Sequence, residues 1–175
     1  MKILITDPIS QDGLDYLEEQ SGIEVVYQPE LSPDVLLSAI RDVEGLIVRS
    51  KTQVTAEVLA VADSLRVIGR AGAGVDNIDL EAATRKGVVV MNTPGGNSTS
   101  AAEHAIALLM ALARKIPFAD LSLRAGKWNK KAFIGQELQG KTLGILGLGK
   151  IGSIVAQRAQ SFHMTVVAYD PFVSE

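Results

Sequence analysis

The feature that most constrains the fold of this chain is a G-x-G-x-x-G pattern at residues 147–152, set between two short apolar runs. Residues 142–146 predict a strand, residues 154–162 an amphipathic helix, and residues 165–169 a second strand closed by Asp170. The order strand, glycine turn, helix, strand and acid is typical of a dinucleotide-binding unit. Glycines alone also mark ordinary tight turns between strands and helices, so the prediction rests on the combination.

Each part of the pattern has a chemical role in holding a dinucleotide. Gly147 allows a tight turn, Gly149 lets the backbone approach a pyrophosphate, and Gly152 lets the helix lie close to the strand. The helix N-terminus offers unpaired N–H groups and the positive end of its dipole to the phosphates. Asp170 is placed to accept hydrogen bonds from ribose hydroxyls. Residues 172–173 include no Lys or Arg for a 2′-phosphate, which favours NAD over NADP.

Composition excludes several classes of function. The 175 residues are 47% hydrophobic with a formal net charge of −3, which suits a globular core and argues against a nucleic-acid binder. There are no cysteines, so disulfides, thiolate metal sites and cysteine nucleophiles are excluded. Residues 2–5 already read as a strand and not as a signal peptide, and the longest apolar run, residues 105–113, is too short to cross a bilayer. We therefore expect a cytoplasmic protein.

Residues 1–94 alternate apolar strand-like runs with helix-like runs. Strands are predicted at residues 2–6, 23–27, 45–48, 66–69 and 88–91. Helices are predicted at residues 13–19, from Ser32 through Ile40, at 55–62, and from Asp79 to Gly87. In the second of these helices, Val35 and Leu36 should point inward with Ile40. Apolar strands separated by helices predict an α/β fold with a flavodoxin-like parallel sheet, followed by the first part of a Rossmann domain.

The pattern changes at residues 92–96, where Pro and Gly indicate a hinge or linker. The next helix is expected to begin with a capping box, Ser100 to Glu103, and to be stopped by Pro117. Because it is apolar nearly all round, we expect it to be buried on most sides. Residues 118–140 show no clear period and place aromatic residues such as Trp128 among charges. This composition predicts an arm that packs on another subunit, the alternative being a surface loop folded onto its own domain.

A second candidate site lies where two predicted strands end. Arg49 and Arg70 each close a buried strand, and a glycine turn at residues 72–74 follows the second. Two guanidinium groups beside free N–H groups can form a receptor for a small acid carrying carboxylate and phosphate. The alternative is that each arginine pairs with a neighbouring acid such as Asp76. His104 and His163 have no acidic partner at a motif spacing and are read as structural.

The residues resemble those of the D-isomer-specific 2-hydroxyacid dehydrogenase family over essentially the whole chain. The matching stretches are residues 46–50, 69–79, 87–94, 98–103, 126–128 and 140–152. The resemblance implies a substrate-binding domain at residues 1–94 and the start of an NAD-binding domain at 95–175, with a dimer arm at 117–140. It further implies a phosphorylated 2-hydroxy acid as substrate, oxidised with NAD in the first step of serine biosynthesis, and a homodimer or homotetramer.

The same resemblance implies roles for individual residues. Substrate would be held by Arg49, Arg70, Asn97 and the backbone of Ala73 and Gly74, with Ala73 also beside the cofactor. NAD would be held by the glycine turn, by Lys150 and Ile151 at the pyrophosphate, and by Asp170 at the ribose. Lys130 could reach the active site of a partner subunit. No metal site is expected.

The family's catalytic arginine, glutamate and histidine match no position in this chain, and neither His104 nor His163 is at the catalytic position. We therefore expect a fragment that is inactive by itself. Two other functions stay open: a dehydrogenase for a different acid, such as glyoxylate or hydroxypyruvate, and a non-catalytic NAD-sensing module on the same scaffold.

Overall fold

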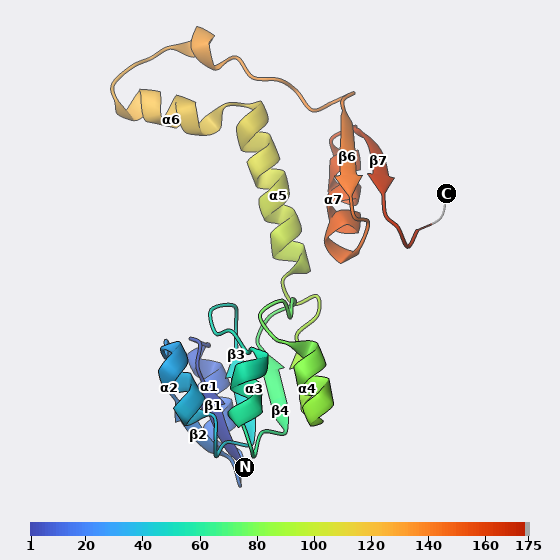
Figure 1. Ribbon diagram of the computed structural model, residues 1–175. Helices are drawn as coiled ribbons and strands as arrows, with labels where there is room; N and C mark the ends of the chain where they lie inside the picture. The colour runs from blue at the N-terminus through green and yellow to red at the C-terminus, as the bar shows by residue number, and fades with distance from the viewer. Residues whose placement is uncertain (174–175) are drawn as a thin grey trace. The chain divides into compact units, whose positions relative to one another are not determined.

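The chain forms two compact units, Met1–Gly96 and Asn97–Glu175, within a computed structural model that describes residues 1–173 (Figure 1). We refer to them as the first and the second unit. Among the described residues, no helix is both long and apolar enough to cross a membrane. Each unit contains its own parallel β-sheet, so each is described by itself.

The first unit is built on a five-stranded sheet in which every neighbouring pair is parallel. Its strands are β1 (Lys2–Ile5), β2 (Glu24–Tyr27), β3 (Gly45–Val48), β4 (Val67–Arg70) and β5 (Val89–Asn92). The spatial order is β2-β1-β3-β4-β5. This is the flavodoxin-like order, which confirms the predicted fold class and puts the topological switch point between β1 and β3.

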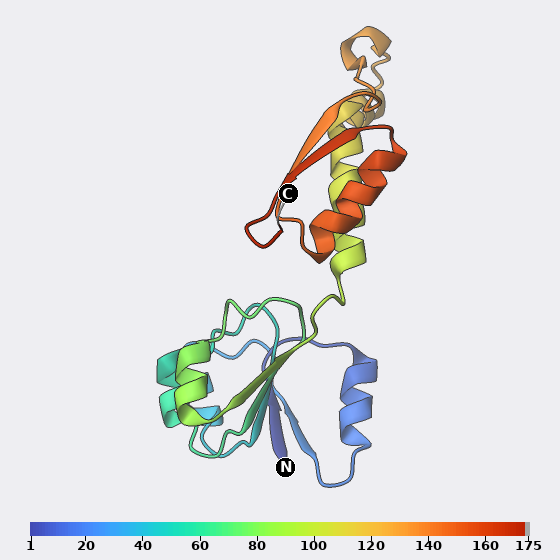
Figure 2. The same ribbon diagram turned by 90° about the vertical axis from the view of Figure 1, so that its right-hand side faces the viewer.

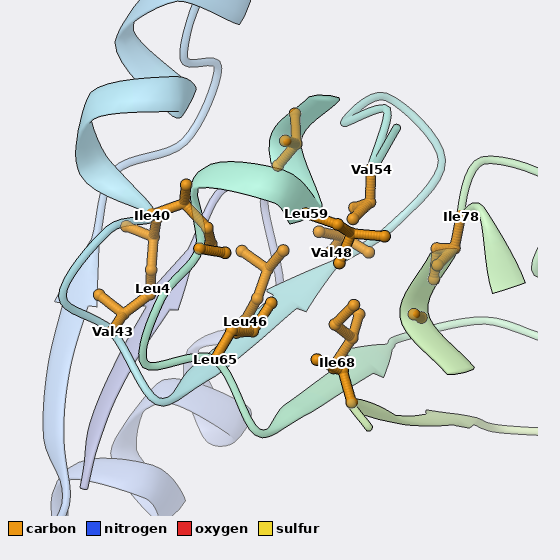
Figure 3. Close-up of a cluster of buried hydrophobic side chains, with 14 of the residues drawn as sticks. Leu4, Ile40, Val43, Leu46, Val48, Val54, Leu59, Leu65, Ile68 and Ile78 are labelled. Carbon is orange, nitrogen blue, oxygen red and sulfur yellow. The ribbon is translucent and has the colours of Figure 1, made fainter. Parts of the chain in front are cut away.

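Four helices cover the two faces of this sheet unequally. They are α1 (Gln11–Glu18), α2 (Pro33–Ala39), α3 (Ala56–Val61) and α4 (Leu80–Lys86). Figure 2 shows α1 on one face and the other three on the opposite face. The larger of the unit's two clusters of buried hydrophobic side chains lies under those three helices. In it, Leu46 and Ile68 of adjacent strands pack among Leu59, Ile40 and their neighbours (Figure 3). These side chains are at most 1% exposed, so the sheet is held by a closed apolar layer.

Four predicted helix ends in this unit are confirmed, whereas α1 begins at Gln11, two residues before the predicted start. The side chains of Ser32, Thr55 and Asp79 each accept a hydrogen bond from the backbone N–H three residues on, and Gly87 ends α4 with a φ of 73°. The inward placement of Val35 is wrong, since that side chain is 49% exposed. Leu36 and Ile40 share one face at i and i+4, and Val35 is turned about 100° away from it.

The second unit contains a two-stranded parallel sheet and its helices. Its elements are α5 (Ser98–Ala113), α6 (Ile116–Arg124), the 3₁₀ helix η1 (Lys130–Phe133), β6 (Thr142–Leu146), α7 (Lys150–Ser161) and β7 (Thr165–Tyr169). Strands β6 and β7 pair from Thr142↔Thr165 to Leu146↔Tyr169, and α5 packs against α7. A small core is formed by Leu138, Ala159 and Met164. The strand–helix–strand order predicted around the glycine turn is therefore confirmed.

Helix α5 differs from the sequence prediction in two respects. Helix α5 begins at Ser98, so Ser100 lies within its first turn and donates its hydroxyl to the Asn97 carbonyl at 3.0 Å, and Glu103 pairs with Arg158 at 2.9 Å, so no capping box forms. The helix is also not buried on most sides, since Leu112 is 74% exposed. Within the described chain, α5 packs mainly against α7 and also contacts α6.

The stretch predicted to be irregular contains a helix. Residues 118–124 belong to α6, and Pro117 lies in its first turn, where a missing N–H leaves no hydrogen bond unmade. What ends α5 is Lys115, whose φ of 55° turns the chain into the left-handed region. Pro117 therefore begins a helix, and the prediction that it stops one is wrong.

Candidate functional site

The carboxyl edge of the first unit's sheet gathers polar residues from four strands. Asp7 follows β1, Arg49 follows β3, Arg70 ends β4 and Asn92 ends β5. Because the strands are parallel, these residues all lie at one edge, and Asp7 and Arg49 flank the switch point between β1 and β3. Ligands of open α/β sheets bind at this place.

Arg70 lies against the glycine turn that follows its strand. Its side chain is only 13% exposed, and its Nε is buried with no hydrogen-bond partner. A Cβ built on Gly72 would lie 2.1 Å from Arg70 Nη1, so the guanidinium occupies space that only a glycine leaves free. Arg70 Nη2 is 4.0 Å from an oxygen of Asp76, whose side chain is 87% exposed. That contact is at the limit of an ion pair and in solvent, so it neutralises little of the charge.

Arg49 presents its charge to solvent. Its side chain makes no ion pair among residues 1–173, and its Nη1 donates to the Pro8 carbonyl at 3.2 Å. The pairing alternative therefore describes Arg70 only in part and does not describe Arg49. A guanidinium with unused N–H groups at a sheet edge is a donor for carboxylate or phosphate.

A buried polar network beneath Arg49 was not predicted from the sequence. Asp7 is 1% exposed and accepts hydrogen bonds from the backbone N–H groups of Arg49 and Thr52 and from the Thr52 hydroxyl. Asn77 donates its amide to the carbonyls of the same two residues, at 2.7 Å each. The sequence signal that could have indicated this network is Asp7 itself, an acid directly after an apolar strand. A carboxylate buried there needs nearby N–H donors.

The loop at residues 72–74 offers backbone donors. The Asn92 amide donates to the Ala73 carbonyl at 2.7 Å, and the Thr93 N–H donates to the Gly72 carbonyl at 3.0 Å. Neither the Ala73 N–H nor the Gly74 N–H is used in a hydrogen bond among the described residues. The loop is thus held by its carbonyls, which leaves two adjacent amides for a ligand.

In the second unit, the glycine turn has the geometry that its pattern predicts. Gly147 has a φ of 94°, and its N–H donates to the Tyr169 carbonyl at 2.8 Å. A Cβ on Gly152 would lie 2.0 Å from the Gly147 carbonyl oxygen, whereas one on Gly149 would meet nothing within 4 Å. Gly152 therefore lets α7 approach the strand, and Gly149 borders open space at the helix N-terminus.

Asp170 closes this turn from the end of β7. One carboxylate oxygen accepts the Leu148 N–H at 2.7 Å, and the other accepts the Phe172 N–H at 2.9 Å. The carboxylate is therefore bonded to the turn itself, which the sequence did not indicate. Each oxygen keeps a further lone pair, and the group is only half-buried, so it can still accept from a ligand hydroxyl.

The remaining predicted residues lie at the surface. Lys150 and Ile151 are exposed in the first turn of α7, and Asn97 is exposed before α5 without a side-chain capping bond. His104 and His163 are exposed on the second unit, and Lys130 is exposed at the start of η1. No cluster of three or more metal-ligating side chains is found among residues 1–173.

The chain matches the family model described as D-isomer specific 2-hydroxyacid dehydrogenase, catalytic domain, over residues 3–173. It therefore belongs to this family, as its sequence resemblance implied. It is 52% identical over 175 residues to D-3-phosphoglycerate dehydrogenase of Archaeoglobus fulgidus and 57% identical over 173 residues to that of Rattus norvegicus. These alignments cover 100% and 99% of this chain but only 33% and 32% of the relatives, so the chain spans about a third of their length.

Solved structures agree with this assignment. The TT0316 protein of Thermus thermophilus matches with a TM-score of 0.91 and 37% identity over 99% of this chain and 57% of its own. The NAD⁺-bound 3-phosphoglycerate dehydrogenase of Entamoeba histolytica matches with a TM-score of 0.80 and 34% identity, covering 100% of this chain and 55% of that one. The family thus includes members that hold NAD.

Proposed function

We propose that the full-length protein oxidises 3-phospho-D-glycerate to 3-phosphooxypyruvate with NAD, the first step of L-serine biosynthesis. The observation that carries the proposal is the pair of arginines at the carboxyl edge of the first unit's sheet, Arg49 with no acidic partner in the described chain and Arg70 with a weak one. Relatives named D-3-phosphoglycerate dehydrogenase at 52% and 57% identity support the same substrate.

The first unit supplies the substrate-binding groups in this proposal. The substrate carries a carboxylate and a phosphate, and the guanidinium groups of Arg49 and Arg70 attract both. The unused amides of Ala73 and Gly74 can donate to a carboxylate oxygen without any change of the loop. A non-catalytic NAD sensor has no need of such a receptor, so the arginines favour an enzyme.

The second unit supplies the NAD-binding groups in this proposal. The pyrophosphate would lie in the open space over Gly149, beside Lys150 and Ile151 in the first turn of α7. The ribose hydroxyls would donate to the half-buried carboxylate of Asp170. Phe172 follows and is 94% exposed, and residues 171–173 hold no cation for a 2′-phosphate. When bound, NAD supplies the acceptor for the hydride that leaves the substrate.

The residues that the family resemblance assigns to proton transfer match no position within residues 1–175. We therefore expect the isolated 175-residue chain to show no turnover of 3-phospho-D-glycerate in the presence of NAD. Measurable turnover by this chain, followed as NADH absorbance, would contradict that expectation.

We also propose that the protein forms a homodimer or homotetramer through residues 117–140. This segment exposes apolar side chains, with Trp128 82% exposed, Ile134 70% and Leu121 65%. An apolar surface of this kind is typical of a subunit interface. Sedimentation of the full-length protein should give an oligomer, and Trp128→Asp should shift it toward the monomer.

The substrate proposal is tested by steady-state kinetics of the full-length protein. We expect kcat/KM for 3-phospho-D-glycerate to exceed that for D-lactate, and the reverse reaction with 3-phosphooxypyruvate to exceed that with glyoxylate or hydroxypyruvate. Arg49→Ala and Arg70→Ala should each lower kcat/KM for the phosphorylated acid by on the order of 100-fold, since each removes a charge-assisted hydrogen bond. Unchanged selectivity in both variants would refute the anion receptor.

A further inference from the structure

We propose that Asp7 is a positioning residue for substrate binding, which acts by fixing the turn from which the Arg49 side chain leaves the backbone. The inference rests on the proposed function, because Arg49 is there the ligand of the substrate anion. It adds a residue to which neither the sequence pattern nor the family resemblance gave a role.

Asp7 is fully committed to the turn at residues 49–52. One carboxylate oxygen accepts the Arg49 N–H at 2.5 Å and the Thr52 N–H at 3.2 Å. The other accepts the Thr52 hydroxyl at 3.0 Å. All three donors belong to two residues of one turn, so the carboxylate fixes the spacing between its two ends.

The turn is held from its other side as well. Asn77 Nδ2 donates to the carbonyls of Arg49 and Thr52 at 2.7 Å each, so both residues are bonded through both backbone groups. The Arg49 guanidinium in turn donates to the carbonyl of Pro8, the neighbour of Asp7. The backbone and the guanidinium of Arg49 are thus both hydrogen-bonded to the segment that carries Asp7.

Burying a carboxylate costs free energy unless polar groups around it stabilise its charge. Asp7 is 1% exposed and, within the described chain, forms no ion pair; its charge is stabilised by backbone and hydroxyl donors and by attraction to the more distant Lys51 ammonium. Three donors converge on it, and an amide side chain would turn an N–H₂ group toward some of them. The converging donors match a carboxylate better than an amide, and they hold the turn from which the Arg49 side chain leaves the backbone.

The test is a double-mutant cycle in the full-length protein with Asp7→Asn and Arg49→Ala. We expect Asp7→Asn to raise KM for 3-phospho-D-glycerate on the order of 10-fold, with kcat and the Kd for NAD changed little. In the Arg49→Ala background, Asp7→Asn should raise KM no further, because the group it positions is gone. A purely structural role would instead give the same added loss in both backgrounds, and that result would overturn the proposal.

Thr52→Val provides a second route if Asp7→Asn does not fold. It removes the hydroxyl bonds to Asp7 and to the Thr6 hydroxyl but keeps the backbone N–H, so a smaller rise in KM with the same dependence on Arg49 is expected. Asp63→Asn is the control, an exposed carboxylate two residues after α3 whose loss should leave KM unchanged. If Arg49→Ala itself leaves KM unchanged, the substrate assignment fails as well. If Arg49→Ala raises KM and the two losses add, only the role of Asp7 fails.

Discussion

The carboxyl edge of the first unit's sheet and the glycine turn of the second unit both follow parallel strands, but they present different groups. At the first, buried Asp7 and Asn77 hold the backbone of Arg49, and the Arg70 guanidinium lies against the glycine turn at residues 72–74. At the second, backbone N–H groups at the start of α7 face open space over Gly149. In the first region, a larger residue beside an arginine meets a flexible side chain that can rotate away. In the glycine turn, a larger residue meets main-chain atoms, which cannot move aside without disturbing the packing.

The largest effect is expected for Gly152→Ala, which tests the backbone half of this contrast. The new Cβ would lie 2.0 Å from the Gly147 carbonyl oxygen and 3.1 Å from its carbon. We expect the free energy of unfolding to fall by about 1–3 kcal/mol and NAD affinity by on the order of 100-fold. Calorimetric titration of the full-length protein with NAD measures the second quantity.

Gly13→Ala is the matched control, because Gly13 also lies within a helix and its Cβ would meet no atom closer than 3.4 Å. There the replacement should raise stability by up to about 1 kcal/mol, as alanine favours a helix over glycine. Similar losses in both variants would mean that crowding at the glycine turn is not the cause.

A smaller effect is expected for Asp170→Asn, in which the side chain that closes the backbone turn loses one acceptor. The carboxylate accepts from both Leu148 and Phe172, and an amide has a single oxygen with which to do so. We expect NAD affinity to fall about 10-fold, while the KM for substrate at saturating NAD stays near its original value. An unchanged Kd for NAD would show that this carboxylate does not shape the turn.

Gly72→Ala should be milder still and gives the side-chain counterpart of Gly152→Ala. Its Cβ would lie 2.1 Å from Arg70 Nη1, but that atom is the far end of a flexible side chain. We expect Arg70 to rotate away, which raises KM for 3-phospho-D-glycerate a few-fold at nearly unchanged melting temperature. A loss of stability as large as that of Gly152→Ala would remove the distinction between the two regions.

The smallest effect concerns the ion pair between Lys51 and Glu30, 2.7 Å apart at the same edge of the first unit. The hydrogen bond and charge of Lys51 lower the pKa of Glu30, and Glu30 raises the pKa of Lys51. Since the folded-state pKa of Glu30 is depressed, its stabilisation is present above the unfolded pKa and is lost as the pH falls through the folded pKa. The Lys51 contribution is present below its unfolded pKa and is lost as the pH rises through its folded value.

Both groups are exposed, so Glu30→Gln should lower the melting temperature only slightly at neutral pH and low salt. The difference from the unsubstituted protein should vanish in acid and in high salt. A difference that persists under both conditions would show that the effect is not electrostatic.

Local signals were sufficient wherever a structure depends on neighbouring residues. Ser32, Thr55 and Asp79 cap the helices they were expected to cap, and Gly147 takes the positive φ that its turn requires. Alternating apolar runs also indicated the parallel sheet, because a strand buried on both faces is apolar throughout. Local patterns failed at α5, where an apolar composition predicted burial on most sides although Leu108 and Leu112 are exposed.

The network of Asp7, Thr52 and Asn77 was out of reach for a different reason. Its members follow β1, β3 and β4, and nothing in their separate surroundings links them. Only the strand order β2-β1-β3-β4-β5 places them at one edge of the sheet.

The sequence by itself determined the glycine turn, the alternation of strands and helices and the family, because each is encoded in short runs of residue type and φ preference. The tertiary structure decided which side chains meet. It placed Arg49 without an acidic partner in the described chain, set the Arg70 guanidinium in the space that Gly72 leaves, and bonded Asp170 to the turn it closes. These contacts join residues brought together by sheet order and close packing, which short stretches of sequence do not specify.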